Sequence, residues 1–220
     1  AYGYTLEKVA YKPLRGAPRL SPLISAIGMS IFLQNYVLLA QTSDYVPFPR
    51  LLPEMEFLDY LGNIMGPSDF LILVTSTLAM ASLSLFIRYT RMGKAMRATA
   101  QNRKMALLLG INADRIISLT FIVGSALAAL GGVLIASHMG QVNFGIGFLA
   151  GLKAFTAAVL GGIGSIPGAM IGGIAIGLCE CFVSAIGLSA WKDAVTFAIL
   201  IIVLLVKPTG FLGRKVQEKV

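Results

Sequence analysis

The sequence predicts an all-α fold: a polytopic membrane helix bundle with about six transmembrane segments. Of its 220 residues, 56% are hydrophobic and 13% are charged, and the mean hydropathy is +0.80. Soluble domains have about 45–50% apolar and about 25% charged residues. Such a composition argues against a soluble enzyme, and the high hydrophobicity excludes a disordered chain. Long apolar stretches and an uneven distribution of charge between them complete the prediction.

A transmembrane helix needs about 20 mainly apolar residues. In chain order, the predicted spans are 21–39, 69–87, 116–137, 144–162, 166–186 and 194–206. The last span is short, but Trp191 and Pro208 flank it, and an interfacial Trp often anchors the end of a membrane helix. The span 144–162 is rich in Gly and carries Lys153 at its middle. A broken or partly re-entrant segment is therefore an alternative to a full crossing there.

The charges between the spans predict the orientation of the chain. Basic residues dominate 1–20, 88–115 and the tail after Val206, whereas 40–68 is mainly acidic. Because cytoplasmic loops carry an excess of Lys and Arg, the three basic segments are predicted to be cytoplasmic, including the C-terminus. The span 116–137 would then end outside the cytoplasm. Because the C-terminus is predicted to be cytoplasmic, the rest of the chain needs an odd number of crossings, which is three. This count predicts a cytoplasmic turn at 161–168, where Gly and Pro are concentrated.

The remaining polar residues indicate no chemistry of catalysis or of metal binding. Cys179 and Cys181 are two residues apart, so on a helix their side chains point away from each other. His138 is the single histidine and adds no cluster of ligands. The sequence has no Ser/His/Asp set and no phosphate-binding loop. We therefore expect no enzyme activity and no cofactor bound by this chain, and any ATP would have to be bound by another chain.

The segment 88–115 is too long and too regular for a plain connection. It holds seven of the 18 basic residues of the chain, an excess that belongs to membrane topology rather than to nucleic-acid binding: Arg88, Arg91, Lys94, Arg97, Arg103, Lys104 and Arg115. On a helix predicted from 93 to 109, one face would hold mostly small side chains, at i, i+3, i+4 spacing. That face consists of Ala95, Ala98, Thr99, Asn102, Met105, Ala106 and Leu109. Gly110 would end this helix and Asn112 would cap the next one.

Two interpretations of this helix remain open. Its cations can anchor the loop to anionic lipid. Alternatively, its small side chains allow close approach of a cytoplasmic partner.

Four glycines in the run GAMIGGIAIG predict a close helix–helix contact. Gly168 and Gly172 are four residues apart, as are Gly173 and Gly177, so each pair places bare backbone on one face of a helix. This pattern indicates packing rather than chemistry.

Two ionisable residues are predicted to lie at membrane depth, where a charge needs a partner or a water-filled cavity. Lys153 and Glu180 fall at depths that allow an ion pair, which would be either a structural contact or the lining of a substrate path. Gln34 and Asn35 in the first span have the same two interpretations, with interhelical hydrogen bonds as the default.

Several runs resemble one family. They are KAFTAAVLGGIGSIPGAMIGG (153–173), RYTRMGKAMRATAQNRKMALLLGIN (88–112), LISAIGMSIFLQNY (23–36), the tail LLVKPTGFLGRK (204–215) and EKVAYKPLRGAPRL (7–20). These runs are similar to the inner-membrane permease subunits of bacterial ABC importers for branched-chain amino acids. The resemblance is strongest to the first of the two related permeases and covers essentially the whole chain. It implies a C-terminal portion of such a permease, lacking the N-terminal helices.

The resemblance implies a pore formed with a second, homologous permease subunit. Two cytoplasmic ATPase subunits would supply the energy, and a periplasmic binding protein would deliver Leu, Ile or Val. The loop 88–115 would be the coupling loop to the ATPase, with Arg97, Ala98, Ala100, Asn102 and Gly110 as contact positions. Arg97 stands where the EAA-type motif of other importers would have its Glu.

A rival class is an ATP-independent secondary transporter or channel for small hydrophobic solutes. Such proteins often couple an ion through intramembrane carboxylates or broken-helix repeats. The sequence has one clear carboxylate within its predicted spans and no convincing internal repeat.

Overall fold

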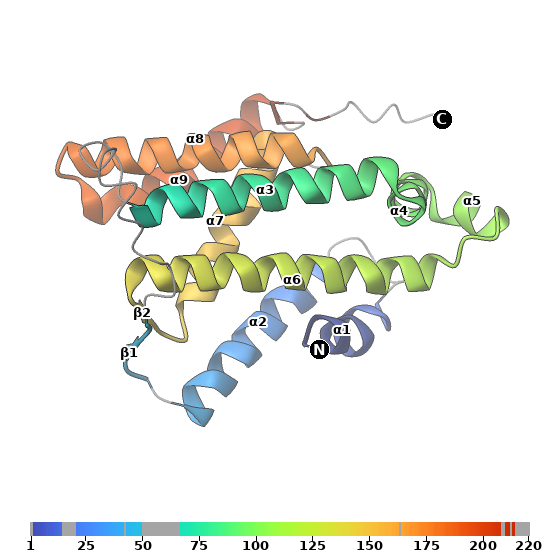
Figure 1. The fold of residues 1–220 in the computed structure, drawn as a ribbon, viewed down its shortest axis with the longest axis horizontal. Helices are drawn as coiled ribbons and strands as arrows, with labels where there is room; N and C mark the ends of the chain where they lie inside the picture. Colours follow the sequence, from blue (N-terminus) through green and yellow to red (C-terminus); the bar gives the residue numbers. More distant parts are fainter. Residues whose placement is uncertain are drawn as a thin grey trace. The chain divides into compact units, whose positions relative to one another are not determined.

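The computed structural model describes residues 2–14, 21–41, 43–49, 67–162, 164–207, 210–211 and 213. Contacts within the chain group it into two compact units, Ala1–Ile146 and Gly147–Val220. Both units are built almost entirely from helices, in agreement with the predicted fold class (Figure 1).

Apolar helices coincide with the six predicted spans. In the described part of the chain, four helices are long and apolar enough to cross a membrane: Asp69–Tyr89, Ala113–Met139, Ile166–Ala185 and Ser189–Val206. Ile24–Ala40 and Ile146–Gly161 are shorter apolar helices. The predicted boundaries differ from the observed ones by a few residues, and the polytopic helical fold is confirmed.

The first unit is organised around one long helix, α6 (Ala113–Met139). The other elements of this unit are α1 (Tyr2–Leu6), the π-helix η1 (Glu7–Tyr11), α2 (Ser21–Ala40), β1 (Val46–Pro47), α3 (Pro67–Tyr89), α4 (Arg91–Gln101), α5 (Arg103–Leu108) and β2 (Gln141–Val142). Helices α3 and α6 run side by side in opposite directions, and α4 lies across the end where α3 finishes and α6 begins (Figure 1). The short N-terminal elements α1 and η1 pack on the same end of α6.

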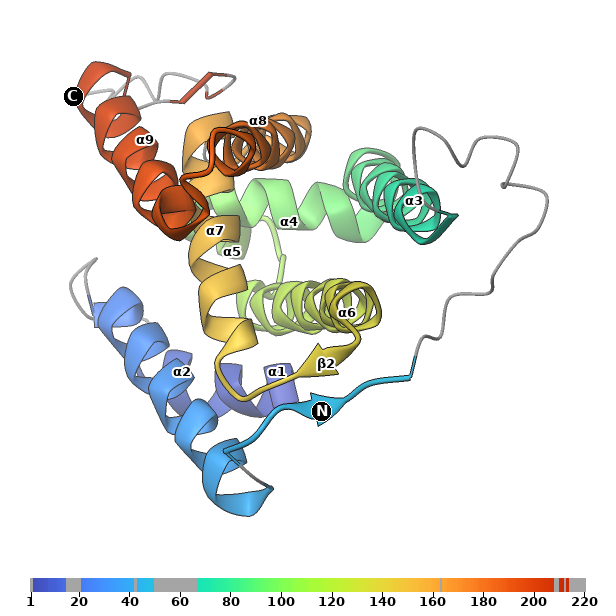
Figure 2. The same cartoon turned by 90° about the vertical axis from the view of Figure 1, so that its left-hand side faces the viewer.

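The opposite end of α6 is joined to the segment after α2. There β1 pairs antiparallel with β2, with Val46 opposite Val142 (Figure 2). The backbone N–H of Phe48 donates to the carbonyl oxygen of Gly140 at 2.9 Å. Nearby, His138 Nδ1 lies 3.1 Å from Asp69 Oδ1, which ties the end of α6 to the first turn of α3. Both side chains of this pair are about half exposed, so it contributes little to stability.

The prediction of one continuous helix over 93–109 is wrong. The helix breaks at Asn102, which has extended backbone angles, and two helices, α4 and α5, flank it. The reason is local: Asn102 Oδ1 accepts a hydrogen bond from the backbone N–H of Met105 and so caps the start of α5. The predicted stop at Gly110 is confirmed, since α5 ends at Leu108 and Gly110 has φ 78°. Asn112 caps α6 by accepting from the N–H of Arg115, as predicted.

The described residues of the second unit form three long helices and one short turn of helix. They are α7 (Ile146–Gly161, whose first residue closes the first unit), α8 (Ile166–Ala185), the 3-10 turn η3 (Ser189–Trp191) and α9 (Lys192–Val206). Helix α7 is continuous, so the alternative of a break within 146–161 is wrong. Its 16 residues span about 24 Å, less than the roughly 30 Å hydrocarbon core. A partly re-entrant position for α7 therefore stays a prediction.

Glycine lets α7 and α8 approach until their backbones touch. A Cβ added to Gly172 would lie 2.2 Å from the carbonyl oxygen of Ala157, and one added to Gly168 would lie 2.3 Å from that of Gly161. The first of the two predicted glycine pairs thus forms the contact. Gly173 has only an ordinary contact, with the Ala157 side chain at 3.9 Å, and Gly177 has no described neighbour within 4 Å. A packing role for Gly173 and Gly177 stays a prediction.

The chain after α9 returns to the turn between α7 and α8. Gly210 has φ 72°, and a Cβ placed there would lie 2.5 Å from the Cα of Gly162. The backbone N–H of Phe211 donates to the carbonyl oxygen of Leu160 at 2.9 Å. Ser165 caps α8 by accepting from the N–H of Gly168 at 3.2 Å. A turn between α7 and α8 is confirmed, whereas its cytoplasmic location stays a prediction.

Candidate functional site

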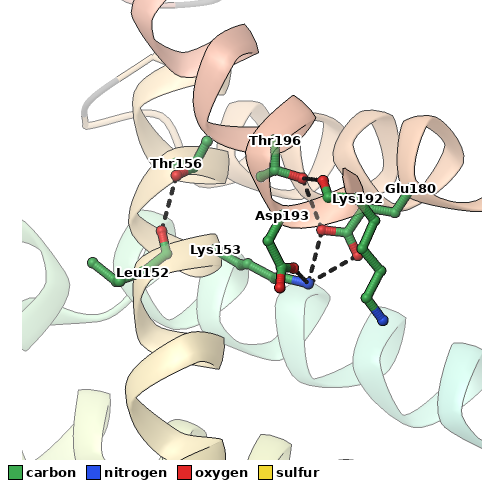
Figure 3. Close-up of polar contacts among 7 residues, drawn as sticks. All are labelled: Leu152, Lys153, Thr156, Glu180, Lys192, Asp193 and Thr196. Atoms are coloured by element: carbon green, nitrogen blue, oxygen red, sulfur yellow. Dashed lines mark hydrogen bonds and ion pairs between the residues drawn. The ribbon is translucent and has the colours of Figure 1, made fainter. Parts of the chain in front are cut away.

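A cluster of charged and hydroxyl side chains joins α7, α8 and α9 in the second unit (Figure 3). The ammonium group of Lys153 lies 2.9 Å from Glu180 Oε1 and 3.0 Å from Glu180 Oε2. It also lies 2.8 Å from Oδ1 of Asp193. Thr196 Oγ1 donates to Glu180 Oε1 at 2.8 Å. The structure therefore confirms that Lys153 and Glu180 pair, and it adds two partners.

The helices bring these side chains together from distant parts of the chain. Lys153 is in the middle of α7, Glu180 is near the end of α8, and Asp193 is the second residue of α9. The 3-10 turn η3 reverses the chain between α8 and α9, so that Glu180 and the first turns of α9 face each other. Glu180 precedes the last residue of α8 by five positions, about 8 Å along the axis. The cluster is thus close to the end of the unit where α8 and α9 meet.

The electrostatics of the cluster are asymmetric, because one ammonium faces two carboxylates. Glu180 has both oxygens engaged, by Lys153 and by Thr196, and its side chain is 20% exposed. Asp193 is 41% exposed and is the most open of the three charged groups. Its Oδ1 is held by the charge of Lys153 and not by a well-directed hydrogen bond. With all three groups ionised, the cluster carries one negative charge in excess.

Thr196 anchors the cluster at its inner side. Thr196 is 1% exposed. Its hydroxyl contacts both the carboxylate of Glu180 and the carbonyl oxygen of Lys192, one turn earlier in α9. A buried carboxylate needs such donors to remain charged at low cost. The arrangement can hold α7, α8 and α9 together, and it can present charge of both signs to a zwitterion that passes.

Sequence reasoning missed Asp193 and Thr196. Asp193 lies one residue before the predicted span 194–206, and Thr196 is a common helix residue in an apolar run. The signal that could have revealed Asp193 is its distance from Glu180. The 12 residues between them leave room for a turn and for two helix ends at similar depth.

Gln34 and Asn35, the other candidates for a path, lie on α2 in the first unit. Asn35 is exposed and its amide nitrogen donates to the carbonyl oxygen of Ile31 in its own helix at 2.9 Å. Gln34 is half-buried beside Gly145, with its Nε2 3.7 Å from where a Cβ of Gly145 would lie. The structure thus gives Asn35 no interhelical hydrogen bond within the described residues. A role of either residue in a path stays a prediction.

The candidate contact positions of the loop lie on α4, on the break and just after α5. Ala100 and Asn102 are exposed, as are Arg97 and Gly110, while Ala98 is half-buried. Arg97 Nη2 reaches the carbonyl oxygen of Arg88 at 3.4 Å. These positions share one surface of the first unit only in part, because the break at Asn102 turns α5 away from α4 (Figure 1).

Apolar side chains around α5 project outward. Leu108 is 81% exposed, Leu109 78% and Met105 57%. Asn102 Oδ1 caps the start of α5, and Arg103 Nη2 contacts Asp114 Oδ1 of α6 at 2.9 Å. Leucines this exposed in a connection between membrane helices are typical of a surface that another protein or the membrane covers. Met105 and Leu109 belong to the face that the sequence predicts to be open to a partner, whereas Leu108 lies outside it.

In the part of the chain that the structure describes, no group of three or more His, Cys, Asp or Glu side chains could hold a metal ion. Cys179 and Cys181 are free thiols.

Comparison with known proteins identifies relatives over the full length of the chain. Residues 11–204 match the family model described as "Branched-chain amino acid transport system / permease component". The chain is 54% identical to the high-affinity branched-chain amino acid transport system permease protein LivH of Escherichia coli K12. This alignment covers all of the chain and 72% of the relative.

Two further relatives are also described as permeases of branched-chain amino acid transport. BraD of Pseudomonas aeruginosa, a high-affinity branched-chain amino acid transport system permease protein, is also 54% identical, with all of the chain and 73% of BraD covered. A probable branched-chain amino acid transport permease protein LivH of Methanocaldococcus jannaschii is 29% identical over 69% of the chain and 49% of that protein. No solved structure matches the chain.

Proposed function

Because the chain belongs to the permease component family of branched-chain amino acid transport systems, we propose that it forms part of the membrane path of an ATP-driven importer for Leu, Ile and Val. The observation that carries the proposal is the 54% identity over the whole chain to two high-affinity permeases of these substrates. The chain is a multi-pass inner-membrane protein and a transport subunit rather than an enzyme. Each further statement about its substrate, partners and orientation is part of this proposal.

The proposed assembly contains a second homologous permease subunit, two cytoplasmic ATPase subunits and a periplasmic amino-acid-binding protein. ATP is consumed by the ATPase subunits, and the present chain binds no cofactor. The exposed Leu108, Leu109 and Met105 support a protein partner at the end of the first unit that carries α4 and α5. The basic character of this loop supports its location on the cytoplasmic side, where the ATPase subunits would bind.

The coupling surface would comprise Arg97, Ala98, Ala100, Asn102 and Gly110 together with the exposed side chains of α5. Closure of the ATPase dimer would pull on α4 and α5. Since α4 contacts both α3 and α6, this movement would reach two membrane helices directly. The permease would then exchange outward for inward access, a shift between two states that ATP binding and substrate stabilise differently.

The polar cluster supports a role in the path. A branched-chain amino acid has an apolar side chain, but its ammonium and carboxylate groups lose hydration inside a membrane protein. Charges of both signs from Lys153, Glu180 and Asp193 can compensate this loss. If α8 runs toward the periplasm, as the charge pattern predicts, the cluster is in the outer part of the membrane and meets the substrate early.

The decisive experiment is ATP-dependent uptake of labelled leucine, isoleucine and valine into liposomes that contain the full complex. We expect uptake to need ATP and the binding protein. Uptake that continues at the same rate without ATP would instead support the rival class, an ATP-independent secondary transporter or channel for small hydrophobic solutes. Absence of ATPase subunits from complexes purified from native membranes would contradict the proposed partners.

The path is tested in the same assay by Glu180→Gln. This variant leaves Lys153 paired with Asp193, so the helices keep an ion pair. Removing a contact with a charged group costs about 1.5–3 kcal/mol, which corresponds to a loss of uptake of roughly tenfold or more if the group acts on the substrate. Asp69→Asn is the matched control, because it removes a carboxylate from an exposed pair with His138 outside the cluster. Uptake and expression unchanged in Glu180→Gln would rule out a role in the path.

A further inference from the structure

A cavity opens between the N-terminal segment and the first turns of α6 in the first unit. Its volume is about 350 Å³, and its lining is divided between charged and apolar side chains. The lining comes from α1, from η1 and the residue after it, and from the first three turns of α6. The π-helix η1 forms one wall, and π-helical turns occur often at functional sites.

The carboxylates that line this cavity have bonding partners, whereas its cations form no ion pairs with the described residues. Its two carboxylates are bonded: Glu7 Oε2 accepts from Ser118 Oγ at 2.7 Å, and Asp114 Oδ1 accepts from Arg103 at 2.9 Å. Glu7 is 1% exposed and is directed inward. Lys8, Lys12 and Arg115 are exposed, and none of these three cations forms an ion pair with another described residue. The cavity therefore combines a cationic opening with carboxylates that are already occupied.

The charged part of the cavity lies at the start of α6, and its apolar part lies farther along the helix. Arg115 is the third residue of α6, whereas Ile122 is the tenth, about 10 Å deeper along the axis. Tyr4 and Ile122 are each nearly half exposed. Helix α6 is long and apolar enough to cross a membrane, and in that position its first turn would lie in the headgroup region and Leu119 and Ile122 at the level of the acyl chains. A phospholipid has the same order, with an anionic phosphate above apolar chains.

We propose that this cavity binds one anionic phospholipid, with the phosphate group held by Lys8, Lys12 and Arg115 and an acyl chain against Tyr4, Leu119 and Ile122. Basic pockets beside membrane helices are suited to acidic lipid headgroups. The site is independent of the path and of the transported substrate. It would tie η1 to α6 at the end of the first unit that also carries α4 and α5.

Native mass spectrometry of the full complex tests the site. The complex is released from vesicles of phosphatidylcholine alone or of phosphatidylcholine mixed with phosphatidylglycerol. We expect retained phosphatidylglycerol and a higher unfolding temperature in the mixed vesicles. Each basic residue near the membrane surface contributes about a fivefold factor in affinity, so Lys8→Gln/Lys12→Gln should lower retention more than tenfold.

The matched control is Arg91→Gln/Lys94→Gln. It removes the same charge from exposed positions of α4 at the same end of the unit but outside the cavity. Retention that falls equally in both variants would show diffuse attraction to the membrane surface and would overturn the site. Unchanged retention in Lys8→Gln/Lys12→Gln would also overturn it. An arm with inorganic phosphate distinguishes the source of the anion, since displacement of the lipid by free phosphate at low concentration would contradict a lipid site.

A measurement on the unmodified protein keeps the test decisive if the variants fail to assemble. A photoreactive phosphatidylglycerol is incorporated into the vesicles and crosslinked to the wild-type complex. We expect crosslinked peptides from residues 4–12 and 115–122. Crosslinks that map only elsewhere on the chain would overturn the proposal. Because both readouts measure lipid and not transport, their outcome is separate from that of the import assay.

Discussion

Two buried threonines show how much the surroundings decide the role of a side chain. Thr156 on α7 and Thr196 on α9 are 0% and 1% exposed. Thr156 donates to the carbonyl oxygen of Leu152 in its own helix, a bond to a neutral acceptor. Thr196 donates to the carboxylate of Glu180 on another helix (Figure 3). The same residue type is therefore a local contact in one helix and an interhelical one in the other.

We predict that Thr196→Val destabilises the protein by about 1.5–3 kcal/mol, because a hydrogen bond to a charged group is lost and the valine replaces the hydroxyl by a methyl. Thr156→Val should cost no more than about 1 kcal/mol, because the shape is kept and the lost bond is neutral. Thermal unfolding of the purified complex measures both. Equal effects of the two substitutions would contradict an interhelical role for Thr196.

At the scale of elements, glycine positions on α8 divide into two kinds. At Gly172 the backbone of α7 is in direct contact, whereas Gly177 on the same helix is open to its surroundings within the described chain. Gly172 lies near the turn that connects α7 and α8, whereas Gly177 is five residues farther along α8 and about 140° around its axis. The face of α8 that carries Gly168 and Gly172 is used within the unit, whereas the face that carries Gly177 is left for lipid or a partner.

Gly172→Ala should therefore prevent the normal approach of α7 and α8. A methyl group 2.2 Å from the Ala157 oxygen requires the helices to separate, which typically costs about 1–3 kcal/mol. Gly177→Ala is the control, and in a helix interior it should be neutral or stabilising by up to about 1 kcal/mol. Yield and unfolding temperature of the assembled complex measure the effect. If Gly177→Ala were the more harmful, the exposed face would be a contact with another subunit.

The break between α4 and α5 makes the short helix depend on its cap. With six residues, α5 is too short to be stable alone, and Asn102 supplies its N-terminal hydrogen bond. We predict that Asn102→Ala costs about 1 kcal/mol and that hydrogen exchange at the amides of α5 becomes faster. Asn112→Ala removes a comparable cap from the long helix α6, where exchange should rise only in the first turn. Unchanged exchange in α5 would show that its contacts with α6 hold it without the cap.

The limits of sequence reasoning follow from the range of the interactions. Hydropathy is summed over about 20 residues, so the spans were predictable to within a few positions. The Lys153–Glu180 pair was predictable because both are charges in apolar runs, and a charge at depth needs a partner. Asp193 and Thr196 were not, since their positions depend on how η3 orients α9 against α8. The break at Asn102 was hidden because the helical periodicity of small residues continues through it.

At the scale of the whole molecule, the testable property is the orientation of the chain in the membrane, that is, which loops lie on which side. The charge pattern predicts that α4 and α5 are cytoplasmic and that η3 between α8 and α9 is periplasmic. In a background with Cys179 and Cys181 replaced by Ser, a single Ser189→Cys should react with a membrane-impermeant maleimide on intact cells. A single Lys94→Cys, which is outside the proposed contact positions, should react only after lysis. Both positions are exposed, so access to the reagent is decided by the side of the membrane. The opposite pattern would invert the topology.

The contact of Gly210 and Phe211 with the α7–α8 turn has a consequence for anyone who builds variants of this protein. These residues come after the last membrane helix, where an affinity tag, a fluorescent fusion or a truncation is usually placed. Here Gly210 and Phe211 are still part of the packed unit, since Gly210 lies against the Gly162 backbone and the N–H of Phe211 bonds to Leu160. A fusion joined directly to Val206 would expose the glycine turn and strip away a hydrogen bond. Fusions should therefore begin after residue 211.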